Sequence, residues 1–402
     1  MNIFKKAYCR IYQKAMKFAS NFLNFRAPVL LKGEDSLLKI KDVLNENKKQ
    51  SVLLVSDAFL SSTDYFRELV EDLEKNNIKV SIFNKVIPNP TIDNIEEGLN
   101  IYKENKCDAI IAYGGGSPID CAKGIAARVT NPKRPIPKMK GLLKVKHKPA
   151  FLIAIPTTAG TGSEATVAAV ISNAKTHEKY AINDPKLIPL YAVLDPKLLV
   201  SLPGKVTSTT GMDALTHAVE AYIGGSNTKA TRKEAKEAVL LIKNNLLKSY
   251  QNPTDLEARN NMQIASYKAG LAFTRAYVGY VHAIAHTLGG MYGVPHGLAN
   301  AVILPHVLRK FGSSCYTRLA ELADYISLTD KDKTKKEKAE AFIDFIDELN
   351  AQMNIPNKIE NVIQEKDLPI MVKRAIKEAN PLYPVPDLWD EKDFLEIFKE
   401  IM

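Results

Sequence analysis

Residues 109–127 read AIIAYGGGSPIDCAKGIAA, an apolar run followed by three glycines and an amphipathic stretch. The run Ala109 to Tyr113 has the length and apolar character of a buried strand. Glycines after a strand let the backbone approach an anion closely, while Ser117 suits an N-cap and Pro118 a first helical position. The stretch therefore predicts a strand, a phosphate site at the start of a helix, and the helix itself. A glycine turn packed for structural reasons alone would have the same sequence.

Similar apolar runs flank this unit and alternate with helical patterns. The expected strands are Ser51 to Val55, Val80 to Phe83 and Phe151 to Ile155, and the expected helices between them are Tyr65 to Lys75 and Ile92 to Glu104. Strands that alternate with helices form right-handed crossovers in a mostly parallel sheet. The first half of the chain is therefore expected to be an α/β domain of the Rossmann-like kind.

The second half shows a different pattern. After Asp195-Pro196 the strand signal disappears, and long helical patterns follow, including Gly211 to Tyr222, Lys233 to Leu247, Leu256 to Thr274 and Lys336 to Asn350. We place the boundary near Pro203-Gly204. The expected organisation is a basic amphipathic N-terminal extension (1–25), an α/β dinucleotide-binding domain (26–203) and an all-helical metal-binding, catalytic domain (204–402).

The composition is that of a globular protein. Apolar residues make up 46% and charged residues 25% of the 402 residues, which argues against disorder and collagen-like repeats. The four cysteines are scattered without a C-x-x-C pair, so we expect a reducing cytoplasm rather than a disulfide framework. No apolar run reaches the roughly 20 residues that span a bilayer. Despite a net charge of +10, no pattern indicates nucleic-acid binding.

The first 25 residues form a basic segment with an apolar face. The segment carries five basic residues and no acid, and its apolar residues from Ile3 to Phe22 recur at near-helical spacing. Such a face can dock on the protein, touch an anionic membrane or resemble a transit peptide. We favour docking over membrane contact, because the segment lacks a long apolar core.

Two more polar positions follow predicted strands. Asp57 comes just after the strand Ser51 to Val55, where a carboxylate can bind the adenosine ribose hydroxyls and repel a 2′-phosphate. This position favours NAD over NADP, although an aspartate there can also cap a helix. The loop from Pro156 to Glu164 is rich in hydroxyls and glycines, and it follows the strand Phe151 to Ile155 at an end where open α/β sheets bind ligands.

Histidines gather in the helical half of the chain. Five of the seven lie there: His217, His282, His286, His296 and His306. Asp213 and His217 are four residues apart, as are His282 and His286, so each pair lies on one face of a helix. His296 follows a Gly-Val-Pro segment that can turn the chain back. We expect Asp213, His217, His282 and His296 to converge from two helices and a loop.

Three imidazoles and one carboxylate suit Fe²⁺, Zn²⁺ or another divalent metal. Such a metal would act as a Lewis acid and lower the pKa of an alcohol oxygen, so that hydride can leave the neighbouring carbon for a nicotinamide. The alternative is a set of buried histidines that are satisfied for structural reasons.

Taken together, these motifs resemble the iron-containing (group III) alcohol dehydrogenase family. The matching stretches are 114–120, 156–164, 194–220 and 281–297, and the resemblance covers roughly residues 26–402 in the expected order. The resemblance implies an α/β dinucleotide-binding domain followed by an all-α domain, an architecture shared with dehydroquinate synthase and glycerol dehydrogenase, with the active site between them. It also implies an NAD-dependent enzyme that uses Fe²⁺ to oxidise a primary alcohol or diol, or to reduce its aldehyde.

The resemblance assigns roles to individual residues. Asp213, His217, His282 and His296 correspond to the metal ligands, and His286 to a histidine beside the substrate and nicotinamide. In the α/β half it assigns the ribose to Asp57 and Lys179, the pyrophosphate to Gly115, Gly116 and Ser117, and the nicotinamide side to Thr157 and Thr158. We also expect a homo-oligomer, specifically a dimer.

Three alternatives stay open. The chain can be an aldehyde reductase that uses NADPH, a hydroxyacid-oxoacid transhydrogenase, or a catalytically silent scaffold of the same fold. The first is disfavoured by Asp57 and the last by the presence of all four ligand positions.

Overall fold

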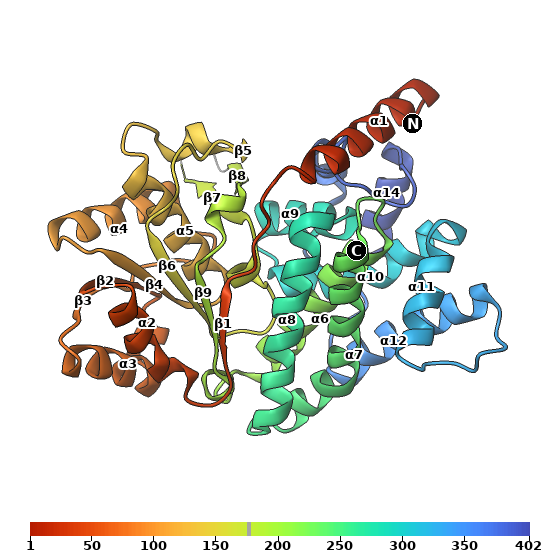
Figure 1. Ribbon diagram of the computed structural model, residues 1–402. Helices are drawn as coiled ribbons and strands as arrows, with labels where there is room; N and C mark the ends of the chain where they lie inside the picture. Colours follow the sequence, from red (N-terminus) through yellow and green to blue (C-terminus); the bar gives the residue numbers. More distant parts are fainter. Residues whose placement is uncertain (175–177) are drawn as a thin grey trace. The chain divides into compact units, whose positions relative to one another are not determined.

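The computed structural model describes residues 1–174 and 178–402. The chain divides into two compact units, residues 25–202 and residues 1–24 together with 203–402. The first contains the sheets and the second is helical (Figure 1).

The first unit is built on a six-stranded sheet in which every pair of neighbours is parallel. The strand order is β1-β9-β6-β4-β2-β3. The strands are β1 (Val29–Lys32), β2 (Ser51–Val55), β3 (Lys79–Phe83), β4 (Ala109–Gly114), β6 (Phe151–Pro156) and β9 (Tyr191–Leu194). All six residues of the central strand β4 are buried, as expected for a parallel strand covered on both faces. The predicted parallel α/β sheet is confirmed.

Helices cover both faces of this sheet. Helices α4 (Ile92–Glu104) and α5 (Gly116–Thr130) lie on one face, and α2 (Ile40–Glu46) and α3 (Asp64–Lys75) on the other (Figure 1). On the α4 and α5 face the core includes Phe83, Ile95 and Ile110. On the other face Phe66 of α3 packs edge-on against Tyr113 of β4, with ring centroids 5.3 Å apart.

Five strands were not predicted from the sequence. Besides β1 and β9, a small second sheet contains β5 (Gly141–Leu142), β7 (Ala168–Asn173) and β8 (Glu178–Asn183) in the order β5-β8-β7. Strands β1, β5 and β9 have four residues or fewer, and β7 alternates between buried and partly exposed positions. Short or half-exposed strands give a weak apolar signal, which explains why they were missed.

The described residues of the second unit form helices and their connections and contain no strand. Its helices are α1 (Ile3–Ser20), α6 (Gly204–Ile223), α7 (Lys229–Gln251), α8 (Leu256–Ala276), α9 (Tyr280–Tyr292), α10 (His296–Phe311), α11 (Ser313–Tyr325), α12 (Lys335–Gln352), α13 (Leu368–Ala379) and α14 (Glu391–Glu400). Short 3-10 turns complete both units: Ser36–Lys39, Leu60–Ser62, Ile136–Met139, Ser163–Ala165, Pro185–Leu187, Pro196–Leu199 and Glu365–Asp367. The all-helical second half is thereby confirmed.

Helix α6 is the centre of this unit. Every residue from Gly211 to Ile223 is buried, because α7, α8 and α10 pack around the helix. A helix enclosed in this way is not expected to have a solvent-facing polar side. Its polar residues Asp213, His217 and Glu220 are therefore inside the protein, where each of them needs a specific partner.

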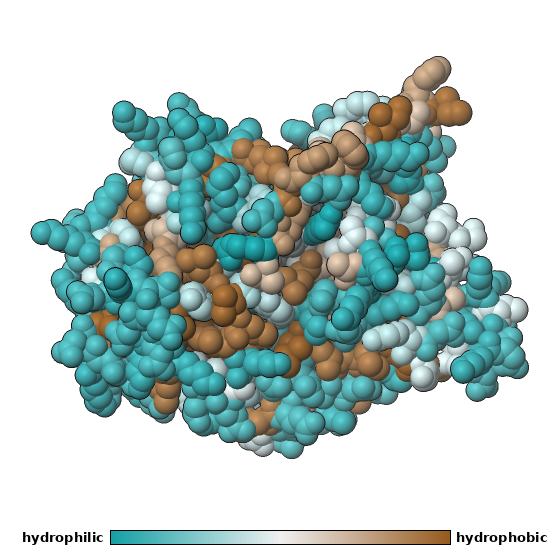
Figure 2. Space-filling view, viewed as in Figure 1, coloured by the Kyte–Doolittle hydropathy of each residue, from teal (hydrophilic) through white to brown (hydrophobic). Residues whose placement is uncertain are grey.

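Helix α1 docks on the helical unit through one face. Cys9 and Gln13 are buried, and Arg10 donates hydrogen bonds to the carbonyl oxygens of Val385 at 2.7 Å and Pro386 at 2.8 Å. The opposite face exposes apolar side chains, among them Phe4, and these appear brown along α1 in Figure 2. These contacts support docking of the N-terminal segment. Among the described helices, none is long and apolar enough to span a membrane.

Candidate active site

Four side chains predicted as metal ligands lie together inside the helical unit. Asp213 and His217 come from α6, His282 from α9 and His296 from α10, and one ligand atom of each lies within 4.8 Å of the others. We call these four residues the tetrad. The expectation that His296 comes from a loop is wrong, because α10 begins at this residue. The tetrad is therefore carried by three helices, which are more rigid supports than a loop.

The start of α10 approaches α6 closely because residue 297 is a glycine. A Cβ atom at Gly297 would lie 2.4 Å from the carbonyl oxygen of Thr209 on α6, far inside the van der Waals limit. The absence of a side chain lets the first turn of α10 rest against α6. As a result His296 Nε2 lies 3.5 Å from Asp213 Oδ1.

The imidazoles of the tetrad are packed against one another and against an aromatic ring. His217 stacks on Phe273 with centroids 4.2 Å apart, and the His217 and His282 centroids are 4.5 Å apart. Burial, reinforced by the neighbouring histidines, holds the pKa of His282 well below its usual value. The neutral imidazole is the form that binds a metal ion.

The donor set fits a divalent cation. The Asp213 side chain is 2% exposed, and its described contacts are with the neutral amide of Asn300 at 2.6 Å and the three imidazoles. A buried carboxylate requires compensating positive charge. Three neutral nitrogens and one carboxylate oxygen, with no thiolate, are ligands that Fe²⁺ and Zn²⁺ accept.

Two residues that support the tetrad were given no role by the sequence analysis. Glu220 accepts hydrogen bonds from the backbone amides of Gly279 at 2.9 Å and Val281 at 2.8 Å, and its carboxylate lies 2.5 Å from His282 Nδ1. Burial raises the pKa of Glu220 to about 8, although the two amides oppose this shift. Asn300 contacts both Asp213 and His296. Each follows a tetrad residue on its own helix, by three and four positions respectively, and this spacing was the available signal.

We predict that Glu220→Gln weakens metal binding roughly 10- to 100-fold, because a carboxylate behind a ligating histidine fixes its ring orientation and raises its basicity. Affinity is measured by anaerobic competition for Fe²⁺ against a chelator. Glu237→Gln is the matched control, since Glu237 lies on α7 and binds Lys268 at 2.6 Å outside the tetrad. Equal affinities in the two variants would contradict a supporting role for Glu220.

His286 lies beside the tetrad but is not part of it. It follows His282 by one turn of α9, and its ring stacks on that of His296 with centroids 5.1 Å apart. Its Nδ1 is 2.6 Å from Oε1 of Glu378 on α13, and that oxygen also accepts a hydrogen bond from the Tyr383 hydroxyl at 2.9 Å. A carboxylate at Nδ1 fixes the ring so that Nε2 is available to accept or donate a proton.

The predicted cofactor residues of the first unit, apart from Lys179, follow adjacent strands. Asp57 comes after β2, Gly115 to Ser117 after β4, and Thr157 and Thr158 after β6. Because these three parallel strands are neighbours in the order β6-β4-β2, the loops lie at one edge of the sheet. Gly115 lies against Thr158, where a Cβ atom would be 3.3 Å from the Thr158 hydroxyl oxygen. The structure thus brings the glycine turn and the threonine loop together.

The glycine turn differs in one detail from the prediction. Ser117 is not the N-cap: α5 begins at Gly116, its N-cap is Gly115, and no side chain caps it. The Ser117 hydroxyl instead accepts a hydrogen bond from the backbone amide of Asn89 at 3.3 Å. Glycines at 114–116 let the helix begin earlier than a serine cap would. A helix start without a side-chain cap leaves its amides for an anion.

Lys179 and Asp57 both have hydrogen-bond partners within the unit. Lys179, on β8, donates a hydrogen bond to Oδ1 of Asn89 at 2.7 Å. Since the backbone amide of Asn89 donates to Ser117, Asn89 links Lys179 to the glycine turn. Asp57 Oδ1 accepts a hydrogen bond from the Leu60 amide at 2.8 Å. The helix cap weighed for Asp57 is not formed as such, because the N-cap of the 3-10 turn Leu60–Ser62 is Phe59, without a side-chain cap. The bond from Leu60 nevertheless uses one of the two carboxylate oxygens of Asp57.

A buried cluster of polar side chains next to the threonine loop, formed by Asp120, Lys123 and Ser163, was not predicted. Lys123 of α5 donates to the Ser163 hydroxyl at 3.1 Å and to the carbonyl oxygen of Ala168 at 2.7 Å. Asp120 accepts from the same hydroxyl at 2.7 Å and from the Val170 amide at 3.0 Å. Burial lowers the pKa of Lys123 to about 8 and raises that of Asp120. These bonds fix the segment that follows Thr157 and Thr158 onto α5.

Comparisons with known proteins cover almost the whole chain. A sequence model described as iron-containing alcohol dehydrogenase matches residues 27–196, and one for the C-terminal part of that family matches residues 207–402. Alcohol dehydrogenase 4 of Schizosaccharomyces pombe is 38% identical over 88% of this chain and 82% of its own length. The NAD-dependent methanol dehydrogenase of Bacillus methanolicus is 34% identical over 88% and 93%. A crystal structure of 1,3-propanediol oxidoreductase matches with a TM-score of 0.91 at 34% identity, over 95% of this chain and all of that one.

Proposed function

This chain belongs to the iron-containing alcohol dehydrogenase family, and we propose that it transfers hydride between small primary alcohols or diols, with their aldehydes, and NAD. The family and the enzyme class expected from the sequence are confirmed, as are iron and NAD as cofactors of the family. The substrate class is our proposal. It is supported by relatives that are named as an alcohol dehydrogenase, a methanol dehydrogenase and a 1,3-propanediol oxidoreductase.

The tetrad is the single observation that carries the proposal. We assign Asp213, His217, His282 and His296 as the ligands of the iron ion, because their donor atoms gather within 4.8 Å in a buried site. When bound, iron supplies Lewis acidity toward an alcohol oxygen and NAD accepts the hydride. Asp213 contributes the negative charge of the site, and Glu220 orients His282.

His286 is proposed as the proton-handling residue. Glu378 holds its Nδ1 at 2.6 Å, which leaves Nε2 to take the alcohol proton or pass it on toward solvent. Its side chain is 26% exposed, so a proton received there can be exchanged with water. His282, at 2% exposed, has no comparable access.

In the first unit we assign residues to parts of the dinucleotide. Gly115, Gly116 and Ser117 are proposed to hold the pyrophosphate at the uncapped start of α5. Thr157 and Thr158 would face the nicotinamide half, and Asp57 and Lys179 the ribose groups. The adjacency of the three loops along β2, β4 and β6 supports a single extended ligand across them.

Asp57→Gly is expected to relax the preference for NAD over NADP. A carboxylate at this position repels a 2′-phosphate and binds ribose hydroxyls, so its removal should raise kcat/KM with NADP and lower it with NAD. The change is measured as the ratio of the two values in steady-state assays. Asp64→Gly, on an exposed position of α3, is the control. An unchanged ratio in Asp57→Gly would remove this residue from the cofactor site.

The function is tested by reconstituting the protein anaerobically with Fe²⁺ and following NADH formation with a panel of primary alcohols and diols. A chelator-treated sample serves as the control. Turnover that depends on the metal supports the proposal and ranks the substrates. Bound metal without turnover on any alcohol would refute it, and a hydroxyacid and oxoacid pair tested without added NAD would then address the transhydrogenase alternative.

We further propose that the enzyme is a homodimer that works in a reducing cytoplasm. All four cysteines are free and buried, which suits a reducing compartment. Strand β1 lies at an edge of the main sheet and exposes Val29, and such an edge can pair with a second copy. Sedimentation equilibrium tests the dimer, and a monomer at all concentrations would reject it.

A further inference from the structure

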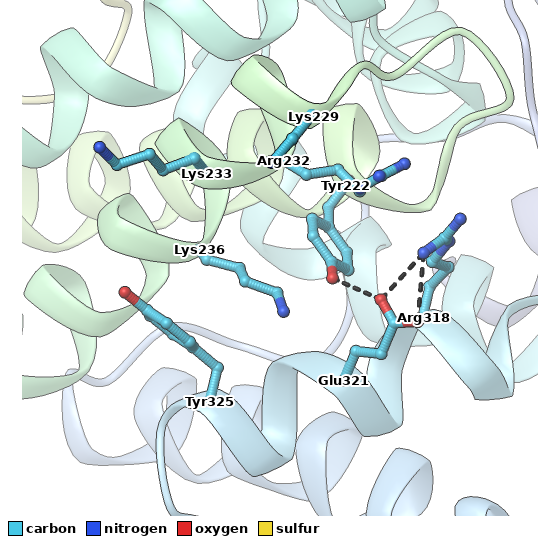
Figure 3. A pocket seen from close by; sticks show the side chains of 8 residues that line it. All are labelled: Tyr222, Lys229, Arg232, Lys233, Lys236, Arg318, Glu321 and Tyr325. Carbon is cyan, nitrogen blue, oxygen red and sulfur yellow. Dashed lines mark hydrogen bonds and ion pairs between the residues drawn. The ribbon is translucent and has the colours of Figure 1, made fainter.

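A cavity of about 460 Å³ in the helical unit has no part in the tetrad or in the proposed cofactor site. It lies between the start of α7, the end of α6 and α11 (Figure 3). Four basic side chains from α7 and one from α11 line it: Lys229, Arg232, Lys233, Lys236 and Arg318. We call it the α7 pocket. Its volume is within the range of small-molecule sites.

The positive charge of the α7 pocket is poorly compensated. Its lining contains a single carboxylate, Glu321, which is already bound by Arg318 at 2.9 Å and by the Tyr222 hydroxyl at 2.5 Å (Figure 3). Burial alone would raise the pKa of Glu321, but the hydrogen bonds from Tyr222 and Arg318 outweigh this effect and lower the pKa below its usual value. Glu321 is therefore an anion. One carboxylate therefore faces five cations.

The described contacts of the α7 cations are mostly with neutral groups. Arg232 donates to the Asn227 side-chain oxygen at 2.9 Å. Lys236 lies over the rings of Tyr222 and Tyr325, 5.5 and 5.4 Å from their centroids. Lys233 has an acidic neighbour, Glu237, at 3.9 Å, but Glu237 also binds Lys268 at 2.6 Å. The lining of the α7 pocket thus carries more positive than negative charge.

This arrangement is unfavourable for the helix itself. Lys229 is the first residue of α7, and no acid lies in the first turn. Cations at a helix start oppose the macrodipole, and like charges three and four positions apart repel one another. Lys229, Arg232, Lys233 and Lys236 have this spacing along one side of α7. An anion bound among these four side chains would offset both the unfavourable interaction with the macrodipole and the repulsion between the like charges.

We propose that the α7 pocket binds a small polyphosphate anion, either free or as part of a nucleoside polyphosphate. Two arginines offer planar guanidinium groups that match phosphate oxygens, and the lysines add point charges. Tyr325 is 41% exposed at the rim, where its ring can stack on a base. The cavity is too small for a long polyanion to be enclosed, so a small ligand is favoured over nucleic acid.

The proposal is tested by calorimetric titration of the iron-loaded, full-length protein with inorganic tripolyphosphate and with ATP. Saturating NAD is present throughout, so that the dinucleotide site does not report. Lys229→Gln/Lys236→Gln is expected to weaken binding at least about tenfold, since each residue contributes a charge-assisted contact. Lys335→Gln/Lys336→Gln removes the same charge from the start of α12 and should bind like the unmodified protein.

The outcomes separate the possible ligands. Equal affinity for tripolyphosphate and ATP assigns the site to the phosphates, and tighter ATP binding adds the base to it. No binding, or equal loss in the two double variants, would overturn the proposal. A single-stranded oligonucleotide that binds much more tightly than both small ligands would also overturn it. Thermal melting without anion checks the fold, because Lys229→Gln/Lys236→Gln should be at least as stable as the unmodified protein.

Discussion

Replacing His282 with alanine should remove the metal and the activity in one step. His282 is 2% exposed, lies 3.9 Å from Asp213 through Nε2, and is held from behind by Glu220. Its loss leaves three ligands and a Glu220 carboxylate without an imidazole partner. The Lewis acidity of the metal lowers the activation barrier by several kcal/mol, so turnover should fall by at least about 10³-fold when the metal is lost. Iron content after gel filtration and NADH formation are measured on the same preparation.

His306→Ala is the matched control for this experiment. His306 lies on α10 in the same unit, but its contacts are with Glu400 at 3.1 Å and the Asn357 carbonyl oxygen at 3.2 Å. We expect it to retain iron and turnover. Equal iron content in the His282 and His306 variants would refute the ligand set, even if activity were lost in both.

Stability gives a second readout that does not depend on turnover. A ligand that binds only the folded state raises the melting temperature. Chelation should therefore lower the melting temperature of the unmodified protein and leave that of His282→Ala unchanged. A chelator-induced shift of similar size in both proteins would show that the metal is bound elsewhere.

The sequence predicts those parts of the site that depend on local spacing. Asp213 and His217 share a face of α6 because they are four residues apart, and this relation survives any arrangement of the other helices. The strand, glycine turn and helix around residue 115 are local in the same sense. The exact start of α5 was not predictable, since a serine cap and a glycine start differ by little free energy.

Contacts between distant segments could not be predicted in this way. Glu220 and His282 are 62 residues apart, and His286 and Glu378 are 92 residues apart. No periodicity in the sequence relates such positions, because their proximity depends on how α6, α9 and α13 pack. The α7 pocket is a similar case: its four basic residues on α7 are close together in the sequence, but Arg318 and its ion-pair partner Glu321 come from α11.

His286→Ala should separate catalysis from metal binding. The residue neighbours His296 and His282 without belonging to the tetrad, so iron should be retained in full. Loss of a positioned acid or base is expected to lower kcat by roughly 10²- to 10⁴-fold. Iron content, kcat and KM are measured together. Loss of iron would instead make His286 a ligand or a structural support of the tetrad.

Glu378 provides the complementary test. It touches His286 and Tyr383 but no tetrad residue among the described contacts, and we regard it as a positioning residue. Glu378→Gln keeps the size of the side chain and can still accept a hydrogen bond from Nδ1, so kcat should fall less than in His286→Ala, with KM and iron unchanged. If Glu378→Gln in the His286→Ala background lowers kcat no further, the two residues act as one unit. A full additional loss would mean that Glu378 acts by another route, and the proton-handling role would then rest on His286 alone.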